Sequence, residues 1–205
     1  MAYEKCTDVS EEIWNDLKNH DPAEITARTG VVFADGCYRL PFLDRELLVN
    51  PERRHIQLAQ DPAADPGFRV CLTAILYLLH LNTQLLGPPI SPLELPGGAT
   101  FFRGHHGLPG GPLEERFGRD LPGLLTAGKR LGAEARAAGD AALALQVFPG
   151  LVVEVILWQA DDEFPAQATF SLPAHLDRCW FLDAVWGLLN LVSQELLKAA
   201  SLENA

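Results

Sequence analysis

The sequence lacks the features that would indicate nucleic acid or a membrane as a partner. Basic residues are few: 16 Lys and Arg stand against 27 Asp and Glu, which gives a formal net charge of −11. Nucleic acid is bound through clustered Lys and Arg, so we expect no nucleic-acid partner. An anionic membrane surface is disfavoured for the same reason. The longest apolar run, about 12 residues, is well short of the roughly 20 that span a bilayer.

Cysteine is also scarce. Cys6, Cys37, Cys71 and Cys179 are scattered, and no Cys-x-x-Cys pair occurs. We therefore expect neither disulfides nor a zinc or iron–sulfur centre built from these four residues. The N-terminus carries no apolar signal segment, which predicts a cytoplasmic protein with reduced thiols. The sequence leaves any cofactor unknown.

Several common catalytic and nucleotide-binding patterns are missing. The chain has no phosphate-binding loop, no Gly-x-Gly-x-x-Gly fingerprint and no Gly-x-Ser-x-Gly nucleophile elbow, so conventional nucleotide and serine-hydrolase chemistry is disfavoured. Apolar residues make up 48% of the chain and charged residues 21%, as in an ordinary globular protein. We expect one domain over residues 1–205, with a helical start and a meander in 1–64 and the remaining elements in 65–205.

The most distinctive stretch is an apolar helix between Asp65 and Gly87. Asp65 suits the N-cap, Pro66 the first helical position, and Gly87 followed by two prolines is a stop signal. Almost every position between these ends is apolar, so the helix is predicted to be buried. We expect it to pack against the last helix, at about 179–200, which also has a wide apolar face.

Strand signals lie on both sides of this helix. Asp35-Gly36 between two alternating runs predicts a hairpin with a type I′ turn. Further strands are expected up to residue 58, a second hairpin around Pro149-Gly150, and another strand at 168–172. Two hairpins or meanders that form antiparallel sheet, packed on two long apolar helices, give an α+β fold.

Three shorter segments carry helix signals. Asp8 to Glu11 resembles a capping box, and Asp21-Pro22 supplies an N-cap followed by Pro at the first position. A helix of moderate length is predicted from Asp120 to Ala138, weakened by three glycines. Residues 88–118 are rich in Pro and Gly, and a segment of this kind has a function or contains short helices.

The first candidate site is the acidic stretch after an apolar strand, from Trp158 through Asp161, Asp162 and Glu163 to Phe164. Carboxylates so close together repel unless a cation, a donor or water separates them. The cluster can hold a metal or a basic ligand group, or supply a general base. The alternative is an acidic loop in which one Asp accepts turn amides and the others face water.

Two further segments are candidates. Gly97 and Gly98, preceded by Glu94, could bring bare backbone amides close to a ligand. His105 and His106 could ligate a metal, although adjacent histidines rarely reach one ion together and a solvated pair is the simpler interpretation.

These segments resemble a family of prokaryotic proteins known as a domain of unknown function, number thirty-seven eighty-six. The likeness covers most of the chain from about residue 20 and rests on Leu76-Tyr77-Leu78 with 86–98, on 157–166, and on His175-Leu176 with the final helix. The resemblance implies that such proteins occur largely in anaerobic bacteria and archaea, and that some of them are associated with one-carbon and corrinoid metabolism. Some members also carry a Cys-rich iron–sulfur segment, which this chain lacks. The family has no established catalytic residues to carry over.

Three hypotheses follow. The first is a cytoplasmic ligand- or cofactor-binding or accessory protein of anaerobic metabolism, with a pocket between 94–111 and Asp161–Phe164. The second is a metal-assisted enzyme that uses Asp161, Asp162 and Glu163 with His105 or His106. The third is a structural subunit, a homodimer or complex partner, in which the last helix offers Trp180 and Trp186. A small molecule or a protein is thus the expected partner.

Overall fold

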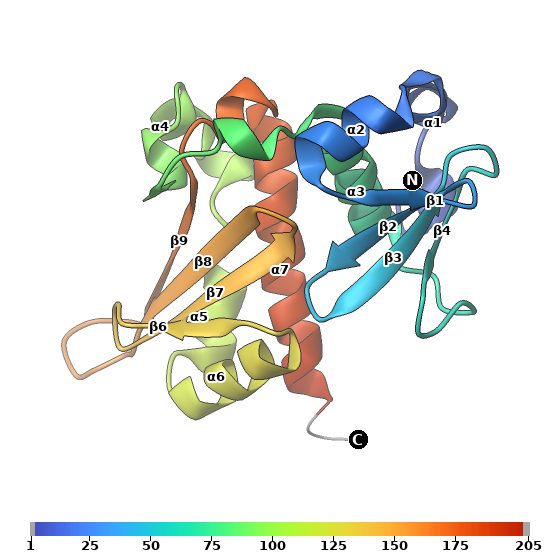
Figure 1. Ribbon diagram of the computed structural model, residues 1–205. Helices are drawn as coiled ribbons and strands as arrows, with labels where there is room; N and C mark the ends of the chain where they lie inside the picture. The colour runs from blue at the N-terminus through green and yellow to red at the C-terminus, as the bar shows by residue number, and fades with distance from the viewer. Residues whose placement is uncertain (1–2, 203–205) are drawn as a thin grey trace. The chain divides into compact units, whose positions relative to one another are not determined.

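A computed structural model describes residues 3–202, and it confirms the α+β fold. The chain divides into two compact units. The first comprises the residues up to Leu85 together with Phe148–Gly150, and the second comprises the rest. Each unit contains one antiparallel sheet, of four strands in the first and five in the second (Figure 1). The single domain over 1–205 stays a prediction, as does the packing of the two long helices on each other.

The helices of the first unit begin largely where local signals place them. Asp21 caps α2, since its Oδ1 accepts the amide of Ala23 at 2.9 Å, and Gly30 ends the helix at φ 72°. The capping box at Asp8 is wrong, because Ser10 is the N-cap and the Asp8 carboxylate accepts the amides of Glu4 and Lys5. The bounds are Glu11–Asn19 for α1, Pro22–Thr29 for α2 and Phe68–His80 for α3.

Helix α3 is buried over most of its length, as predicted, but both ends differ from the prediction. Eight of its 13 residues are buried. Gly67 rather than Asp65 is the N-cap, and the helix stops at His80, which is exposed, before Gly87 is reached. Pro66 lies before the helix because Gly67, at φ 90°, turns the chain into it.

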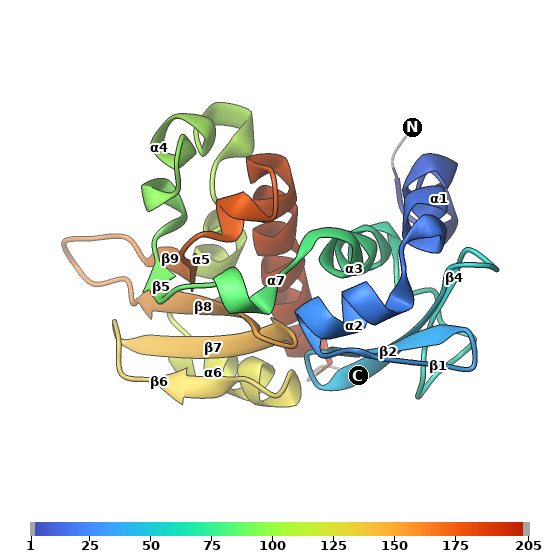
Figure 2. The same cartoon turned by 45° about the horizontal axis from the view of Figure 1, so that its top comes forward.

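The first sheet is a simple meander in the order β1-β2-β3-β4. Asp35 and Gly36 both have positive φ, 52° and 75°, which confirms the predicted hairpin turn. Figure 2 shows α2 and α3 on one side of this sheet. The strands are Val32–Ala34 (β1), Cys37–Phe42 (β2), Arg45–Asn50 (β3) and His55–Leu58 (β4).

Aromatic rings fill the core of the first unit. The Tyr77 ring lies 4.8 Å from that of Phe148, which in turn lies 5.5 Å from that of Phe42. The Tyr77 hydroxyl donates to the carbonyl oxygen of Pro149 at 2.9 Å. Burial raises the pKa of Tyr38 to about 12. All four rings are essentially inaccessible to water, so their contribution is to stability.

The expectation of four reduced cysteines is wrong for two of them. Cys6 and Cys71, whose Cα atoms are 5.4 Å apart, form a disulfide across 65 residues of sequence. Spacing alone gave no sign of this pair, because the bridge depends on how the N-terminal segment folds back onto α3. Cys37 and Cys179 are free thiols.

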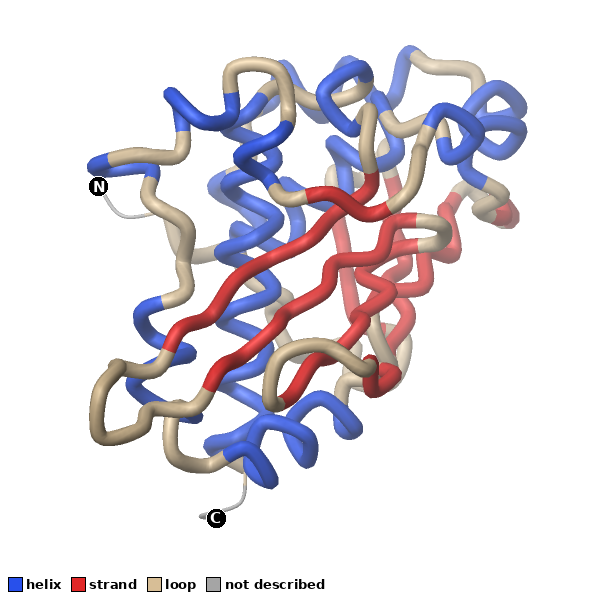
Figure 3. The backbone as a smooth tube through the Cα atoms, turned by 90° about the vertical axis from the view of Figure 1, so that its left-hand side faces the viewer, coloured by secondary structure: helices blue, strands red, loops and turns tan. Residues whose placement is uncertain are grey.

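The second unit is built on the sheet β5-β9-β8-β7-β6. The predicted hairpin around Pro149-Gly150 and the strand that follows it are confirmed. Alternate residues of β8 are buried, which gives the sheet one face toward a helical layer (Figure 3). The strands are Pro89–Ile90 (β5), Glu134–Arg136 (β6), Ala141–Phe148 (β7), Leu151–Trp158 (β8) and Gln167–Pro173 (β9).

Helices of the second unit cover that sheet. Gly128 on α6 leaves room for Leu143 of β7, and Arg130 donates to the carbonyl of Ala199 on the last helix. The predicted helix Asp120–Ala138 is too long: Gly132, at φ 72°, ends it and the chain continues as β6. The helices are Gly98–Phe101 (α4), Gly111–Phe117 (α5), Leu121–Arg130 (α6) and Leu182–Ser201 (α7).

The segment 88–118 contains the short helices that the sequence left as one of two options. Besides α4 and α5 it holds two 3-10 turns, η3 (Pro92–Glu94) and η4 (Gly104–His106). Across residues 3–202 we find no helix whose length and hydropathy would suit a membrane span.

Candidate functional site

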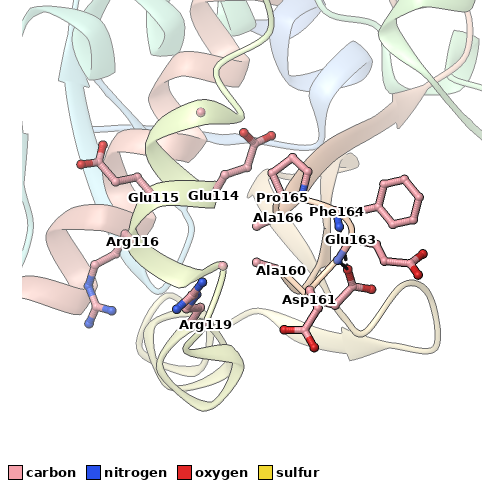
Figure 4. A pocket seen from close by; sticks show the side chains of 13 residues that line it. Glu114, Glu115, Arg116, Arg119, Ala160, Asp161, Glu163, Phe164, Pro165 and Ala166 are labelled. Atoms are coloured by element: carbon pink, nitrogen blue, oxygen red, sulfur yellow. Dashed lines mark hydrogen bonds between the residues drawn. The ribbon is translucent and has the colours of Figure 1, made fainter.

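Two clefts in the second unit share the acidic loop after β8. The first, of about 650 Å³, lies between α5 with the residues just after it and the loop 160–166 (Figure 4). The second, of about 730 Å³, adds Asp140 and Trp158 to the same loop. Pro165 and Ala166 face α5, whereas the ring of Phe164 is turned away from it. The loop 160–166, hereafter the acidic loop, thus separates two concave surfaces.

The acidic loop is held by its own backbone amides. Asp161 Oδ1 accepts the amides of Glu163 and Phe164 at 2.8 and 2.7 Å, and the Asp161 amide donates to the carbonyl of Phe164 at 3.0 Å. These two amides, Phe164 first, hold the pKa of Asp161 below its usual range. Asp162 and Glu163 are exposed. This is the arrangement of the alternative interpretation: one Asp ties the turn and its neighbours face water.

Gly118, at the end of α5, brings the loop against the helix. Its carbonyl accepts the amide of Ala160 at 3.0 Å, and a Cβ at this position would collide with the Cβ of Ala166 and the carbonyl oxygen of Glu114. Glu114 itself reaches the start of β9, where its Oε1 accepts the amide of Ala168 at 2.9 Å. The wall of the first cleft is therefore set by backbone contacts on both sides.

The first cleft carries an excess of negative charge. Five carboxylates and two guanidinium groups line it. Arg116 is paired with Asp120 at 2.8 Å, and with the amide of Gly123 it holds the pKa of Asp120 below its usual range. Arg119 is exposed. Concave surfaces lined by one sign of charge concentrate ions of the opposite sign, so this cleft favours a cation. The lining carboxylates are Glu114, Glu115, Asp161, Asp162 and Glu163.

Two large aromatic side chains at the clefts are exposed. Trp158, the last residue of β8, is 40% accessible, and Phe164 is 67% accessible. Both line the second cleft. Aromatic faces that are open to water can accept the apolar body of a ligand or a cation above the ring. Residues 161–164 line the first cleft, and Trp158 with Asp161 and Phe164 lines the second.

The glycine segment that was predicted to face this loop has a different role. Glu94 accepts the amide of Ser91 at 2.9 Å and completes the cap of η3. Gly98 packs directly on the carbonyl of Pro92, and Gly97 adopts φ 79° at the start of α4. None of these three residues lines either cleft. The close backbone approach that Gly98 allows is made to the protein itself, and Gly97 is exposed.

The two histidines lie on η4. His106 stacks on Phe101 with the ring centroids 4.5 Å apart, meets Trp186 edge to face, and has its Nε2 3.7 Å from Asp183 Oδ1. His105 is exposed. Among residues 3–202, no three His, Cys, Asp or Glu side chains are grouped so that they could hold a metal ion. The metal-assisted enzyme with Asp161 and Glu163 as ligands stays a prediction.

The two tryptophans that the interaction hypothesis offers to a partner make contacts within the second unit. Trp180 is only 3% accessible. Trp186 is half-buried and donates from Nε1 to the carbonyl of Gly107 at 3.1 Å. Trp180 therefore offers nothing to a partner, while the neighbouring Phe181 is 89% accessible. A homodimer or a complex through this helix stays a prediction.

Sequence reasoning missed the helix that forms the other wall. The side chains on this wall include Glu114, Glu115 and Arg116, which lie in the segment 88–118 where short helices were only one of two options, and Arg119 directly after it. A local signal exists there: Gly111-Pro112 begins the helix, and Leu113 with Phe117, four residues apart, are both buried. The fact that this helix meets the acidic loop depends on contacts some 40 or more residues apart, which no local pattern shows.

Comparison with known proteins gives one family. The family model described as Domain of unknown function (DUF3786) matches residues 21–195. No curated protein and no solved structure matches the chain. The matched range contains the acidic loop, α5 and both clefts. The chain therefore belongs to the DUF3786 family.

Proposed function

We propose that this protein is a binding module that holds a small organic cation in the cleft between α5 and the acidic loop. The observation that carries the proposal is the lining of that cleft, in which five carboxylates outnumber two guanidinium groups and one of these is already paired. The cytoplasmic location that the sequence predicts and the anaerobic, one-carbon-linked setting that the family resemblance implies are part of the proposal.

The loop is organised before any ligand arrives. Asp161 uses Oδ1 to order the turn, so the exposed carboxylates of Asp162 and Glu163 are carried on a defined backbone. A preorganised site loses less conformational entropy on binding than a flexible one. The charge of the ligand would be met by these two carboxylates and by Glu115 on α5.

The exposed rings set the shape of ligand that fits. Phe164 lines this cleft and offers an apolar face beside the carboxylates, whereas Trp158 lines the second cleft on the other side of the loop. A ligand that carries an ammonium or guanidinium group on an aliphatic or planar body would use both kinds of contact. An anionic ligand would face repulsion from most of the lining charges.

Spermidine is a suitable probe for this chemistry, measured by isothermal titration calorimetry at low salt. Each ion pair at 4 Å in water contributes about 1 kcal/mol, so Glu163→Gln should weaken binding by about fivefold. The matched control is Glu12→Gln, which removes the same charge from an exposed position on α1. It should leave the affinity unchanged.

Equal weakening by both variants would contradict a site at the cleft, since general attraction to an acidic protein would then explain the binding. Absence of any spermidine heat, together with unchanged melting, would contradict the cationic ligand. Native mass spectrometry of protein purified without oxygen then identifies the natural ligand, and a co-purifying anion at this cleft would also overturn the proposal.

A further inference from the structure

The segment before α1 crosses the beginning of α3. Residues 3–8, hereafter the N-terminal strap, contain the 3-10 turn η1 (Cys6–Asp8). The ring of Tyr3 stacks on that of Phe68 with centroids 4.9 Å apart. The carbonyl of Glu4 accepts the amide of Phe68 at 2.9 Å. The strap therefore contacts the first residue of the helix with both a ring and a backbone group.

The start of α3 depends on these contacts. The N-cap, Gly67, has no side chain to accept the free amides of the first turn. The strap supplies one acceptor through Glu4. Asp65 Oδ1 joins the two segments, because it accepts the amide of Gly67 at 2.8 Å and that of Cys6 at 3.2 Å. The strap thus replaces the side-chain cap that the sequence of α3 lacks.

A single covalent bond secures this arrangement. Cys6 on the strap is joined to Cys71, which lies in the first turn of α3. The non-covalent contacts described above are made largely by exposed or half-buried residues of the strap and the helix start. Hydrogen bonds and ring contacts at such positions open readily. The disulfide therefore decides how long the strap stays on the helix.

We propose that the Cys6–Cys71 disulfide is a redox latch, which a dithiol reductant opens to release the N-terminal strap from α3. A thiolate of the reductant attacks the sulfur of Cys6 and displaces the thiolate of Cys71. The second thiol of the reductant then displaces Cys6, so that the reductant ends as a disulfide. Two electrons and two protons pass to the protein, and both cysteines end as thiols.

The positions of the two sulfurs suit this direction of attack. Cys6 retains 8% of its surface, whereas Cys71 has none, so the reductant meets Cys6 first. The departing sulfur belongs to Cys71, in the first turn of the 13-residue helix α3, and the N-terminal end of a helix favours negative charge. In a reducing compartment such as the cytoplasm that the sequence predicts, disulfides are mostly transient and regulatory. This inference does not depend on the cleft.

The test compares the oxidised and reduced forms of the full-length protein. Alkylation without reductant should label two cysteines in protein treated with oxidised dithiothreitol, and four after reduction of the folded protein with dithiothreitol. Limited trypsin digestion then measures release of the strap through cleavage after Lys5, which is exposed. Reduction should accelerate this cleavage by about tenfold or more, as expected for a segment that opens locally.

Variants separate the latch from general effects of reduction. Cys6→Ser should show fast cleavage with or without dithiothreitol, whereas Cys37→Ser, which alters a free thiol, should behave as the natural protein. Failure of the disulfide to form under oxidised dithiothreitol would overturn the proposal. So would resistance of the folded protein to reduction, or equal cleavage rates after Lys5 in the oxidised and reduced forms.

Discussion

Two groups of aromatic residues, one in each unit, differ in their exposure to water. In the first unit Phe42, Tyr77 and Phe148 are enclosed and contact one another. In the second, Trp158 and Phe164 stand open to water beside carboxylates. Burying a large ring stabilises a fold, whereas leaving it exposed contributes little to stability. We therefore expect substitutions of the enclosed rings to lower stability, and substitutions of the exposed pair to leave stability nearly unchanged.

The largest effect is expected at Tyr77. Tyr77→Ala removes a buried ring and should lower the free energy of unfolding by about 3–5 kcal/mol, the range for large aromatic truncations in a core. Tyr77→Phe keeps the ring, loses the hydrogen bonds that the hydroxyl donates to the carbonyl oxygens of Pro149 and Thr29, and should cost about 1 kcal/mol. Urea denaturation measures both. A Tyr77→Ala loss below that of Tyr77→Phe would show that the ring is not part of a packed core.

Gly118 tests the junction of α5 with the acidic loop. Gly118→Ala places a methyl group against Ala166 and Glu114, and overpacking of this kind costs about 1–3 kcal/mol. Gly187→Ala, on α7, is the matched control, because a Cβ there meets nothing within 4 Å and Gly187 lines neither cleft. The midpoint temperature of thermal unfolding and the affinity for spermidine should both fall for Gly118→Ala, and neither should fall for the control. Identical behaviour of the two variants would contradict the close approach of the loop to the helix.

The buried phenols of the first unit predict a loss of stability at alkaline pH. The pKa of Tyr38 is raised to about 12, chiefly by burial and then by Asp21. Because this pKa is higher in the folded than in the unfolded protein, the hydroxyl contributes its full stability below the unfolded pKa of about 10 and loses it as the pH rises toward 12. The difference between a pKa of about 10 and one of about 12 corresponds to about 2–3 kcal/mol. Burial raises the pKa of Tyr77 as well. Denaturation between pH 9 and pH 12 measures the loss, which Tyr38→Phe should reduce.

The hydrogen bonds that Asp161 accepts within the acidic loop should weaken at acidic pH. The pKa of Asp161 is lowered by the amides of Phe164 and Glu163, so its contribution is present above the unfolded pKa and disappears as pH falls through the folded one. Hydrogen exchange at the Phe164 amide should therefore lose protection in acid. In Asp161→Asn protection should be weaker and independent of pH, and a pH response equal to that of the natural protein would contradict this role for Asp161.

The smallest effect on stability is expected at Phe164. Its ring is mostly in water, so Phe164→Ala should change the free energy of unfolding by no more than about 0.5 kcal/mol, as surface substitutions do. Spermidine affinity should nevertheless fall by a factor of about two to five, since a cation–ring contact at an exposed site is worth about 0.5–1 kcal/mol. A loss of stability well above this value would show that the ring of Phe164 is packed as the core aromatics are, and would contradict its exposure to water.

Local signals in the sequence predicted those parts of the fold that depend on neighbouring residues. Asp21-Pro22 and Asp35-Gly36 gave the correct cap and turn because each is a short-range interaction. The same reasoning placed Asp120 correctly at a helix start. It failed at Gly132, where a left-handed residue ends the helix well before Ala138. The local sequence does not determine whether a glycine inside a helical pattern adopts the helical or the left-handed conformation, because glycine populates both readily.

Features built from distant segments were out of reach. The Cys6–Cys71 bridge joins residues 65 positions apart. The acidic loop was singled out by its composition, but α5, which faces it across the first cleft, was not. Gly98 packs on the carbonyl of Pro92, and Gly97 is exposed outside both clefts. Composition can mark a segment as unusual, whereas the surface that it faces follows from the fold.

The most direct test of the account is the mapping of spermidine on the folded protein by amide chemical shifts in NMR. Shifts that saturate with spermidine should centre on Gly118 and on residues 160–164, which line the first cleft. Saturable shifts centred elsewhere, or small shifts spread evenly over every acidic surface, would contradict the cleft as the binding site.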